Sequence, residues 1–470
     1  MKPRISLREA LSDPNLLGSA LAGDSWKAWR TLLIAAMGEE LTADERAIFA
    51  KLTGREREPL RPVEEFLAVV GRRGGKSRAL ATFGAYISGL AEHPSLVPGE
   101  RGVALCIAPD TRQASIALEY CAAVFEQSPI LRSLIVGRTT DSLSLSNGVE
   151  MEVRAASFRR LRGPTYVAVI ADEVAFWTSE EWSSNPDREI LDAVRPGLAT
   201  TGGPLILASS PYARRGVLWQ SYKRDFGSNG DPLVLVAKGA TRELNPSLPQ
   251  SVIDRAYERD RAAAAAEYGA EFRTDLEAFV PLEAVEACVG DYREMAPSAA
   301  QRYFAFVDPS GGSSDSFTLA IGHKEGSDKR IVIDVVREVR PPFSPEAVIA
   351  EFAALCQRYR IHLVIGDRYA GEFPREGFAK FSISYEPSAK PKSDLYRDFL
   401  ALLNSGRVVL PKHEKVVHQL VGLERRTSRG GRDSIDHAPG GHDDLANSVA
   451  GVADVISSGR GGYNLDALAS

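Results

Sequence analysis

The stretch LAVVGRRGGKSRALATFGAYISGL, residues 67–90, constrains the fold of this chain more than any other segment. An apolar run leads into three closely spaced glycines, and a stretch rich in helix-forming residues follows them. Glycine adopts backbone angles that other residues avoid, which allows a sharp turn between two regular elements. We therefore expect a strand, a glycine-rich turn and a helix in that order.

Three more short apolar runs follow this segment. They are GVALCIAP at 102–109, YVAVIADE at 166–173 and PLILASSP at 204–211. Near-continuous apolar strands that alternate with helical stretches are typical of a parallel sheet covered by helices on both faces. An α/β domain is therefore predicted for residues 1–244, in which residues 1–60 form a helical N-terminal part.

A second alternating region begins near residue 301. Three expected strands at 302–310, 316–324 and 329–339 precede a helix that starts near residue 345 and a strand at 361–368. Further helices are expected at 393–404, 414–426 and 442–457. The pattern predicts a second α/β domain over 301–458, a helical linker or small subdomain over 245–300, and a flexible tail over 459–470.

The composition is that of an ordinary globular protein, because 44% of the 470 residues are hydrophobic and 25% are charged. No apolar run approaches the roughly 20 residues that span a bilayer, so no membrane partner is predicted. The four cysteines lie far apart without metal-ligand spacing, which indicates reduced core residues. The net charge of −5 does not favour nucleic acid, and basic clusters at 157–163, 212–216 and 424–432 are each compatible with solvated surface.

The glycine turn falls one residue short of the phosphate-binding pattern G-x-x-x-x-G-K-[ST], since Val70 stands where its first glycine belongs. In a phosphate-binding loop, Gly71, Gly74 and Gly75 would let backbone N–H groups face the phosphates of ATP. Lys76 would contact phosphate, and Ser77 would ligate Mg²⁺. Taken alone, the segment is also compatible with a plain glycine turn.

Asp172 and Glu173 end the strand at 166–173. In an ATPase, Asp172 would hold Mg²⁺ and Glu173 would orient the attacking water. A charged turn after a core strand is the alternative, but it does not explain the GKS loop upstream. Ser209 and Ser210 end the next strand, where they would sense the γ-phosphate or serve ordinary loop chemistry.

Four aspartates stand at element ends in the second region. Asp308 and Asp367 each end an apolar strand, and Asp443 and Asp444 open the final helix. Two-metal cleavage of a phosphodiester needs three or four carboxylates around a pair of cations, Mg²⁺ or Mn²⁺. Each aspartate taken singly is also compatible with a cap or turn. Adjacent helical residues point about 100° apart, so only one of Asp443 and Asp444 faces the cations directly.

Two neighbours, Asp315 and His442, either join this site or lie outside its ligand set.

In this order, the motifs GRRGGKS, IADE, ASSP, FVDPSGG, VIGD and GHDDLANS resemble those of the large subunit of tailed-phage terminases, over residues 64–458. The resemblance implies an N-terminal P-loop ATPase of the ASCE type with a parallel sheet and a C-terminal RNase H/RuvC-like nuclease. It also implies a motor that drives double-stranded DNA through a portal protein into a procapsid by ATP hydrolysis and cuts concatemeric DNA.

The implied partners are the portal protein, a small terminase subunit and other copies of the chain in a pentameric ring. The implied location is the host cytoplasm, transiently at the portal vertex and not in the mature virion.

The resemblance assigns Lys76 and Ser77 to the phosphate loop, Asp172 and Glu173 to the acidic strand end, and Ser209 and Ser210 to a coupling motif. It assigns Asp308, Asp367 and one of Asp443 and Asp444 to the nuclease.

Terminases often carry an arginine within the phosphate loop, a role open to Arg72 and Arg73. Either of them would contact the γ-phosphate or hold the loop in place. Arg162 is the candidate for an arginine that acts on a neighbouring subunit's ATP. No glutamine precedes Gln113, so the adenine-contacting glutamine of many relatives is not assigned.

Two other functions are compatible with these motifs. One is a cellular P-loop ATPase fused to a RuvC-like nuclease in DNA repair, and the other is a DNA-binding scaffold with degenerate sites. The intact Lys76, Glu173, Asp308 and Asp367 argue against the scaffold.

Overall fold

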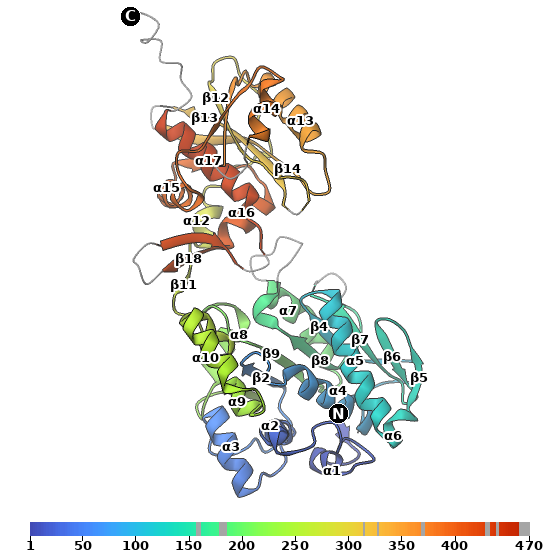
Figure 1. Ribbon diagram of the computed structural model, residues 1–470. Coiled ribbons are helices and arrows are strands. Elements are labelled where there is room, and N and C mark those ends of the chain that lie inside the picture. Colours follow the sequence, from blue (N-terminus) through green and yellow to red (C-terminus); the bar gives the residue numbers. More distant parts are fainter. Residues whose placement is uncertain are drawn as a thin grey trace, which may run out of the picture. The chain divides into compact units, whose positions relative to one another are not determined.

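The computed structural model describes residues 1–156, 161–177, 186–313, 315–326, 329–367, 372–427, 433–438 and 441–459 (Figure 1). They form two compact units, Met1–Thr274 and Asp275–Ser470. The boundary between the units lies inside the range 245–300, for which a helical linker or small subdomain is predicted. The predicted flexible tail lies outside the described residues except for Gly459.

The first unit contains ten strands and eleven α-helices among its described residues. The strands are β1 (Lys2–Pro3), β2 (Glu65–Val70), β3 (Ala91–Glu92), β4 (Gly102–Ala108), β5 (Ile135–Arg138), β6 (Ser142–Leu145), β7 (Val149–Ala155), β8 (Thr165–Asp172), β9 (Leu205–Ser209) and β10 (Val234–Gly239). The helices are α1 (Leu7–Ser12), α2 (Lys27–Ala36), α3 (Ala43–Thr53), α4 (Lys76–Leu90), α5 (Thr111–Gln127), α6 (Pro129–Arg132), α7 (Pro186–Leu198), α8 (Gly216–Asp225), α9 (Thr241–Leu244), α10 (Gln250–Arg259) and α11 (Arg261–Glu267).

The main sheet of this unit has the strand order β10-β2-β9-β8-β4-β7-β6-β5. Neighbouring strands from β10 to β7 are parallel, whereas β6 is antiparallel to both β7 and β5. The sheet is therefore mixed, and the purely parallel sheet of the prediction holds only for its larger part. β9 lies between β2 and β8, which separates the strand before the glycine turn from the strand that ends in Asp172. This insertion is the ASCE arrangement that the resemblance to terminases implies.

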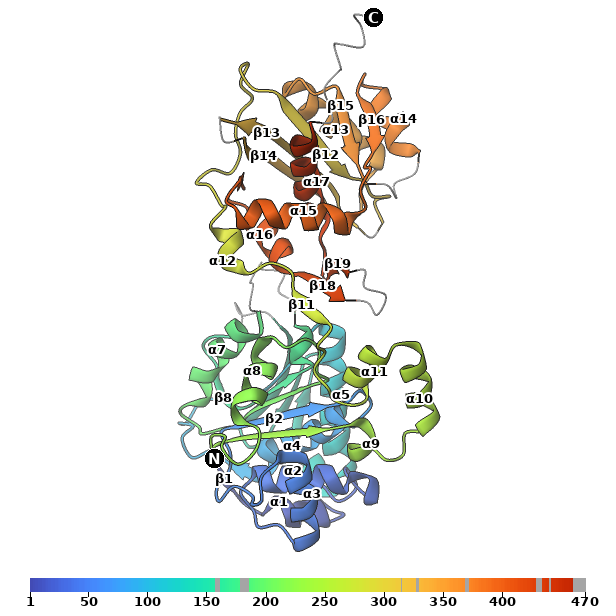
Figure 2. The ribbon, with the colours of Figure 1, turned by 90° about the vertical axis from the view of Figure 1, so that its left-hand side faces the viewer.

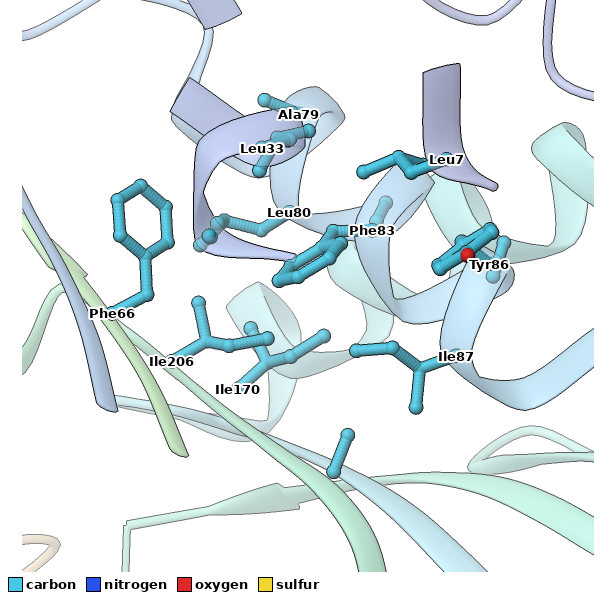
Figure 3. Close-up of a cluster of buried hydrophobic side chains, with 14 of the residues drawn as sticks. Leu7, Leu33, Phe66, Ala79, Leu80, Phe83, Tyr86, Ile87, Ile170 and Ile206 are labelled. Atoms are coloured by element: carbon cyan, nitrogen blue, oxygen red, sulfur yellow. The ribbon is translucent and has the colours of Figure 1, made fainter. Parts of the chain in front are cut away.

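The core of the first unit lies on both faces of this sheet. Phe66 of β2 faces one core cluster, and its neighbour Leu67 faces the other. On the first face, Phe83 and Ile87 of α4 point toward the sheet, as Figure 3 shows. Leu33 of α2 packs on the outer side of α4, which joins the predicted helical N-terminal part to the same core.

The second unit contains nine strands and six α-helices among its described residues. The strands are β11 (Leu276–Ala278), β12 (Tyr303–Asp308), β13 (Phe317–Glu325), β14 (Arg330–Val339), β15 (Leu363–Gly366), β16 (Ser384–Pro387), β17 (Val408–Val409), β18 (Leu423–Thr427) and β19 (Asp433–His437). The helices are α12 (Leu282–Glu286), α13 (Pro345–Arg358), α14 (Phe373–Ala379), α15 (Lys392–Asn404), α16 (Glu414–Val421) and α17 (Asp444–Ser458).

The main sheet of the second unit has the order β16-β15-β12-β13-β14-β17. β13 is antiparallel to both of its neighbours, β12 and β14, while β15 and β16 run parallel to β12. This is the strand order of the RNase H-like fold, as predicted. α17 crosses the sheet over β12 and β13 (Figure 2). The carboxyl ends of β12 and β15 and the start of α17 therefore meet at one edge.

The predicted helix at 414–426 is wrong in its second half. α16 ends at Val421, and residues 423–427 form β18. β18 pairs with β11 on one side and with β19 on the other. Glutamate and arginine favour a helix locally, but the hydrogen bonds to two strands from distant parts of the chain outweigh that propensity.

All four cysteines are buried and free, as predicted. No described helix is long and apolar enough to cross a membrane.

Candidate nucleotide and metal sites

The glycine-rich turn joins β2 to α4, as the sequence predicts. Gly75 caps the helix with φ 88°, and Arg73 adopts φ 65°. Two other glycines are required by close approach. A Cβ atom at Gly71 would lie 2.4 Å from Oγ1 of Thr241, and one at Gly74 would lie 2.5 Å from Cγ1 of Val70. The turn is therefore a tightly packed loop at a helix N-terminus, where backbone N–H groups favour an anion.

Lys76 lies at the centre of the nucleotide site and is only 6% exposed. Its Nζ donates to the carbonyl oxygen of Val70 at 3.2 Å and to Oγ of Ser210 at 2.9 Å. The ammonium group also lies 3.3 Å from Oε1 of Glu173. Lys76 thus connects the loop with the ends of β8 and β9, the two strands on which the sequence predicts partner residues.

Ser77 and Asp172 meet as a Mg²⁺ site requires. Oγ of Ser77 donates to Oδ2 of Asp172 at 3.0 Å. Desolvation raises the pKa of Asp172 to about 6, and the nearby Glu173 carboxylate adds to the increase. A divalent cation would offset this repulsion, and a hydroxyl with a carboxylate oxygen is the donor set that Mg²⁺ prefers. The two residues therefore fit the cation.

Glu173 is hydrogen-bonded to both serines at the end of β9, Ser209 and Ser210. It adopts φ 51°, and its Oε2 accepts hydrogen bonds from Oγ of Ser209 at 3.2 Å and from the backbone N–H of Ser210 at 3.3 Å. The structure thus brings Glu173, Ser209 and Ser210 together. The coupling role of the serines stays a prediction.

The three predicted arginines do not enter this site within the chain. Arg72 forms an exposed ion pair with Glu267 of α11, with Nη1 and Oε1 3.1 Å apart. Arg73 is exposed, and its side chain has no ion pair or hydrogen bond with the described residues. Arg162 precedes β8, whereas Asp172 ends it, and the strand spans about 23 Å at its usual rise per residue. Arg162 therefore lies at the opposite edge of the sheet from the loop of its own chain.

Several side chains that the sequence did not reveal donate hydrogen bonds to carbonyl oxygens of the loop. Oγ1 of Thr241 donates to the carbonyl oxygen of Arg72 at 2.8 Å, and Nδ2 of Asn245 donates to that of Arg73 at 2.9 Å. Trp29 donates from Nε1 to the carbonyl oxygen of Gly74 at 2.7 Å. These donors come from distant parts of the chain, and no sequence spacing relates them to the loop.

A cavity of about 510 Å³ in the second unit collects the predicted acids. The predicted residues in its lining are Asp308, Asp315, Asp367, His442, Asp443 and Asp444. The expectation that strand ends and a helix start converge is therefore met for every proposed nuclease residue. Asn447, Lys392 and His437 also line the cavity, and the sequence analysis missed them. Asn447 follows Asp444 by one helical turn, which is the one sequence signal that would have found it.

Asn447 bridges the two strand-end aspartates. Its Nδ2 donates to Oδ2 of Asp308 at 2.8 Å and to Oδ2 of Asp367 at 3.0 Å. Burial raises the pKa of Asp308 well above its usual value, and the charges of Asp367 and Asp444 add to the increase. The cavity therefore concentrates negative charge that a cation would neutralise.

Asp443 and Asp444 have different surroundings. Oδ2 of Asp443 lies 2.9 Å from Nζ of Lys392 and accepts a hydrogen bond from the hydroxyl of Tyr396 at 2.8 Å. Oδ2 of Asp444 is buried and accepts no hydrogen bond from the described residues, and the same holds for Oδ1 of Asn447. Burial, with the adjacent Asp443 charge, raises the pKa of Asp444 to about 6. Asp444 is thus the better candidate ligand, and its orphaned oxygen fits a cation.

A second group of ligand-type atoms lies beside Asp443. Atoms of Asp436, His437 and Asp443 lie within 4.8 Å of one another. Nζ of Lys392 already reaches this group, at 3.0 Å from Oδ1 of Asp436. Nδ1 of His437 lies 2.8 Å from the carbonyl oxygen of Ala438, which only accepts, so Nδ1 carries a proton. An ammonium cation thus neutralises these acids from within the chain.

No protein-family model and no curated protein matches the chain. Among solved structures, the large terminase of bacteriophage HK97 is 15% identical, with 84% of this chain and 91% of that chain covered at a TM-score of 0.37. The large terminase nuclease of the thermophilic phage G20c is 17% identical, with coverages of 37% and 96% and a TM-score of 0.33. An ATPase-domain variant of the large terminase of Thermus phage P74-26 is 17% identical, with coverages of 50% and 96% and a TM-score of 0.36.

The two sites support two kinds of chemistry. In the first unit, a helix N-terminus, a buried lysine and two acids surround the place of a nucleotide's phosphates, which is the equipment for phosphoanhydride hydrolysis. In the second unit, acids from two strands and one helix line an open cavity, which is the equipment for metal-dependent phosphodiester cleavage.

Proposed function

We propose that this chain is the large subunit of a terminase, a DNA-packaging enzyme with an ATPase site and a nuclease site. The observation that carries the proposal is the presence of both sites in one chain, each of which gathers acids from the ends of its strands. Lys76 contacts Glu173 in the first unit. Asp308 and Asp367 share Asn447 in the second.

In the ATPase site, Lys76 would bind the β- and γ-phosphates, and Ser77 and Asp172 would hold Mg²⁺. When bound, the cation would supply positive charge beside the phosphates. Glu173 orients the attacking water, and its hydrogen bonds to Ser209 and Ser210 link that water to the end of β9. The end of β9 would thus respond to whether Glu173 contacts the water or the two serines. This response would couple hydrolysis to movement.

In the nuclease site, Asp308, Asp367 and Asp444 would hold Mg²⁺ or Mn²⁺, which would supply an activated water and offset charge on the leaving oxygen. Asn447 keeps Asp308 and Asp367 side by side, and Lys392 neutralises Asp443, so that it does not compete for the cations.

The motor translocates double-stranded DNA through a portal protein into the procapsid, and the nuclease cuts concatemeric DNA when packaging starts and ends. DNA is held through its phosphates, which makes binding salt-dependent and independent of sequence. A small terminase subunit and further copies of this chain in a pentameric ring complete the motor. It acts in the host cytoplasm, transiently at the portal vertex, and is absent from the mature virion.

The ATPase part is tested with Glu173→Ala in the full chain. Loss of the residue that orients the water should lower DNA-stimulated ATP hydrolysis by about 100-fold or more while cutting of plasmid DNA continues. The matched control is Glu189→Ala, which removes an exposed glutamate of α7. ATP hydrolysis by Glu173→Ala at the wild-type rate would contradict the assignment as a motor.

The nuclease part is tested with Asp308→Ala. Mn²⁺-dependent cutting of plasmid DNA should disappear while ATP hydrolysis stays unchanged, and undiminished cutting would remove Asp308 from the site. Co-assembly of the wild-type chain with a portal ring separates a packaging enzyme from a repair enzyme. Failure to bind any portal ring, with both activities intact, would favour the repair enzyme.

A further inference from the structure

Two tryptophans donate from their indole N–H groups to the backbone of the two nucleotide motifs. Nε1 of Trp29 donates to the carbonyl oxygen of Gly74 at 2.7 Å, and Nε1 of Trp177 donates to the carbonyl oxygen of Asp172 at 2.9 Å. The exposed fractions of the two residues are 0% and 5%. An indole has a single donor, so the one N–H group of each of these buried tryptophans is used in the nucleotide site.

The Trp29 bond sets the direction of one peptide plane in the phosphate loop. In a trans peptide, the carbonyl oxygen of Gly74 and the N–H of Gly75 point in opposite directions. Capture of the oxygen by Trp29 therefore turns the Gly75 N–H away from the core and toward the side where phosphate binds. The loop rests on a second ring as well, because a Cβ atom at Gly75 would lie 2.9 Å from Cζ3 of Trp26.

The Trp177 bond does the same for the acidic motif. It holds the carbonyl oxygen of Asp172, while the N–H of Glu173 in the same peptide donates to Oδ1 of Asp172 at 3.0 Å. Both ends of this peptide are therefore fixed. Glu173 has φ 51°, a left-handed conformation that costs a non-glycine residue energy. Trp177 stabilises that conformation and so aims the Glu173 carboxylate.

The two tryptophans come from opposite sides of the sheet. Trp29 belongs to the core cluster of one face together with Phe66, and Trp177 belongs to that of the other face together with Leu67. Each of the two core clusters thus contributes one buried tryptophan that is hydrogen-bonded to one motif. We infer that Trp29 and Trp177 are positioning residues of the proposed ATPase, Trp29 for nucleotide binding and Trp177 for the hydrolytic step. This inference rests on the proposed function of the first unit.

The test uses the full chain with Trp29→Phe and Trp177→Phe, which keep an aromatic ring and remove the N–H group. The matched control is Trp219→Phe on α8, where the ring packs against Phe272 at 4.8 Å between centroids and the indole N–H donates to neither motif among the described residues. The measurements are the Kd of Mg·ADP by titration calorimetry and the steady-state kcat and KM for ATP.

Loss of one hydrogen bond predicts roughly five- to tenfold weaker Mg·ADP binding for Trp29→Phe, with kcat within about twofold of wild type. For Trp177→Phe, kcat should fall about tenfold or more, with the Kd of Mg·ADP within about twofold. Trp219→Phe should leave both quantities unchanged. An unchanged Kd for Trp29→Phe, or an unchanged kcat for Trp177→Phe, would overturn the corresponding assignment. Both assignments would also fail if each variant lost Mg·ADP affinity and kcat to the same extent.

If a phenylalanine variant fails to fold, benzothienylalanine is placed at the same position. It keeps the bicyclic shape and replaces the N–H group with sulfur, and the same split between Kd and kcat is expected. A wild-type chain that binds Mg·ADP but does not hydrolyse ATP contradicts the proposed function, while its Mg·ADP affinity still decides the role of Trp29. An active wild type with unaffected variants contradicts only the present inference.

Discussion

The ion pair between Lys392 and Asp443 keeps a buried carboxylate neutralised beside the nuclease cavity. Lys392→Met removes the ammonium group and retains the apolar stem of the side chain. Asp443 is 7% exposed at its side chain and, among the described residues, would keep only the Tyr396 hydroxyl as a donor. The variant therefore leaves a buried carboxylate whose charge has no counter-ion.

The magnitude follows from the distance between the charges. At 2.9 Å and an effective dielectric constant of about 20, the attraction between Lys392 and Asp443 is about 6 kcal/mol. The cost of desolvating the two groups offsets about half of it, so the free energy of unfolding should fall by about 3 kcal/mol in Lys392→Met. Asp443→Asn should cost only about 1 kcal/mol, because Lys392 keeps Asp436 as a partner at 3.0 Å.

The assay is a double-mutant cycle, with urea unfolding of the second unit followed by a probe placed in it. The double variant Lys392→Met/Asp443→Asn leaves no unpaired charge at position 443. It should therefore be about 2 kcal/mol more stable than the sum of the single effects predicts. Additive effects within about 0.5 kcal/mol would refute the reasoning, because they would mean that the two charges do not interact across the cavity edge.

Three further outcomes are expected. In a plasmid-cutting assay, Asp444→Asn should lower Mn²⁺-dependent cutting by about 100-fold or more, and Asp443→Asn should lower it by less than about tenfold. The reverse order would make Asp443 the ligand. Gly451→Ala should destabilise the second unit by about 1–3 kcal/mol, because its Cβ would lie 2.4 Å from the Phe306 ring beneath α17. DNA cutting should fall while ATP hydrolysis stays unchanged. An unchanged melting curve would contradict this packing. Glu58→Gln should lower the unfolding free energy by about 1–2 kcal/mol at pH 7, since the Arg46 guanidinium holds the pKa of Glu58 at about 2. A lowered pKa stabilises the fold above the unfolded pKa near 4.5, so the difference from wild type should narrow as the pH falls from 4.5 toward 2, whereas a difference independent of pH would rule out the ion pair as its source.

Much of both sites was predictable because their residues stand at the ends of strongly apolar strands. Lys76 follows β2, Asp172 ends β8, Asp308 ends β12 and Asp367 follows β15. Parallel strands of one sheet carry their carboxyl ends to the same edge, so the order of motifs along the chain was enough to place these groups together. The helix at 414–426 was predicted wrongly because local propensity does not contain the pairing of β18 with two distant strands.

The sequence by itself determined which chemical groups stand at which strand ends, because covalent neighbours and the apolar pattern fix that much. Tertiary structure alone decided between groups that are adjacent in the chain. Asp443 contacts Lys392, while Oδ2 of Asp444 accepts no hydrogen bond from the residues that the structure describes. Arg72 turns away from the loop to Glu267. Each choice depends on a partner from a distant segment, and only packing brings that partner within hydrogen-bonding distance.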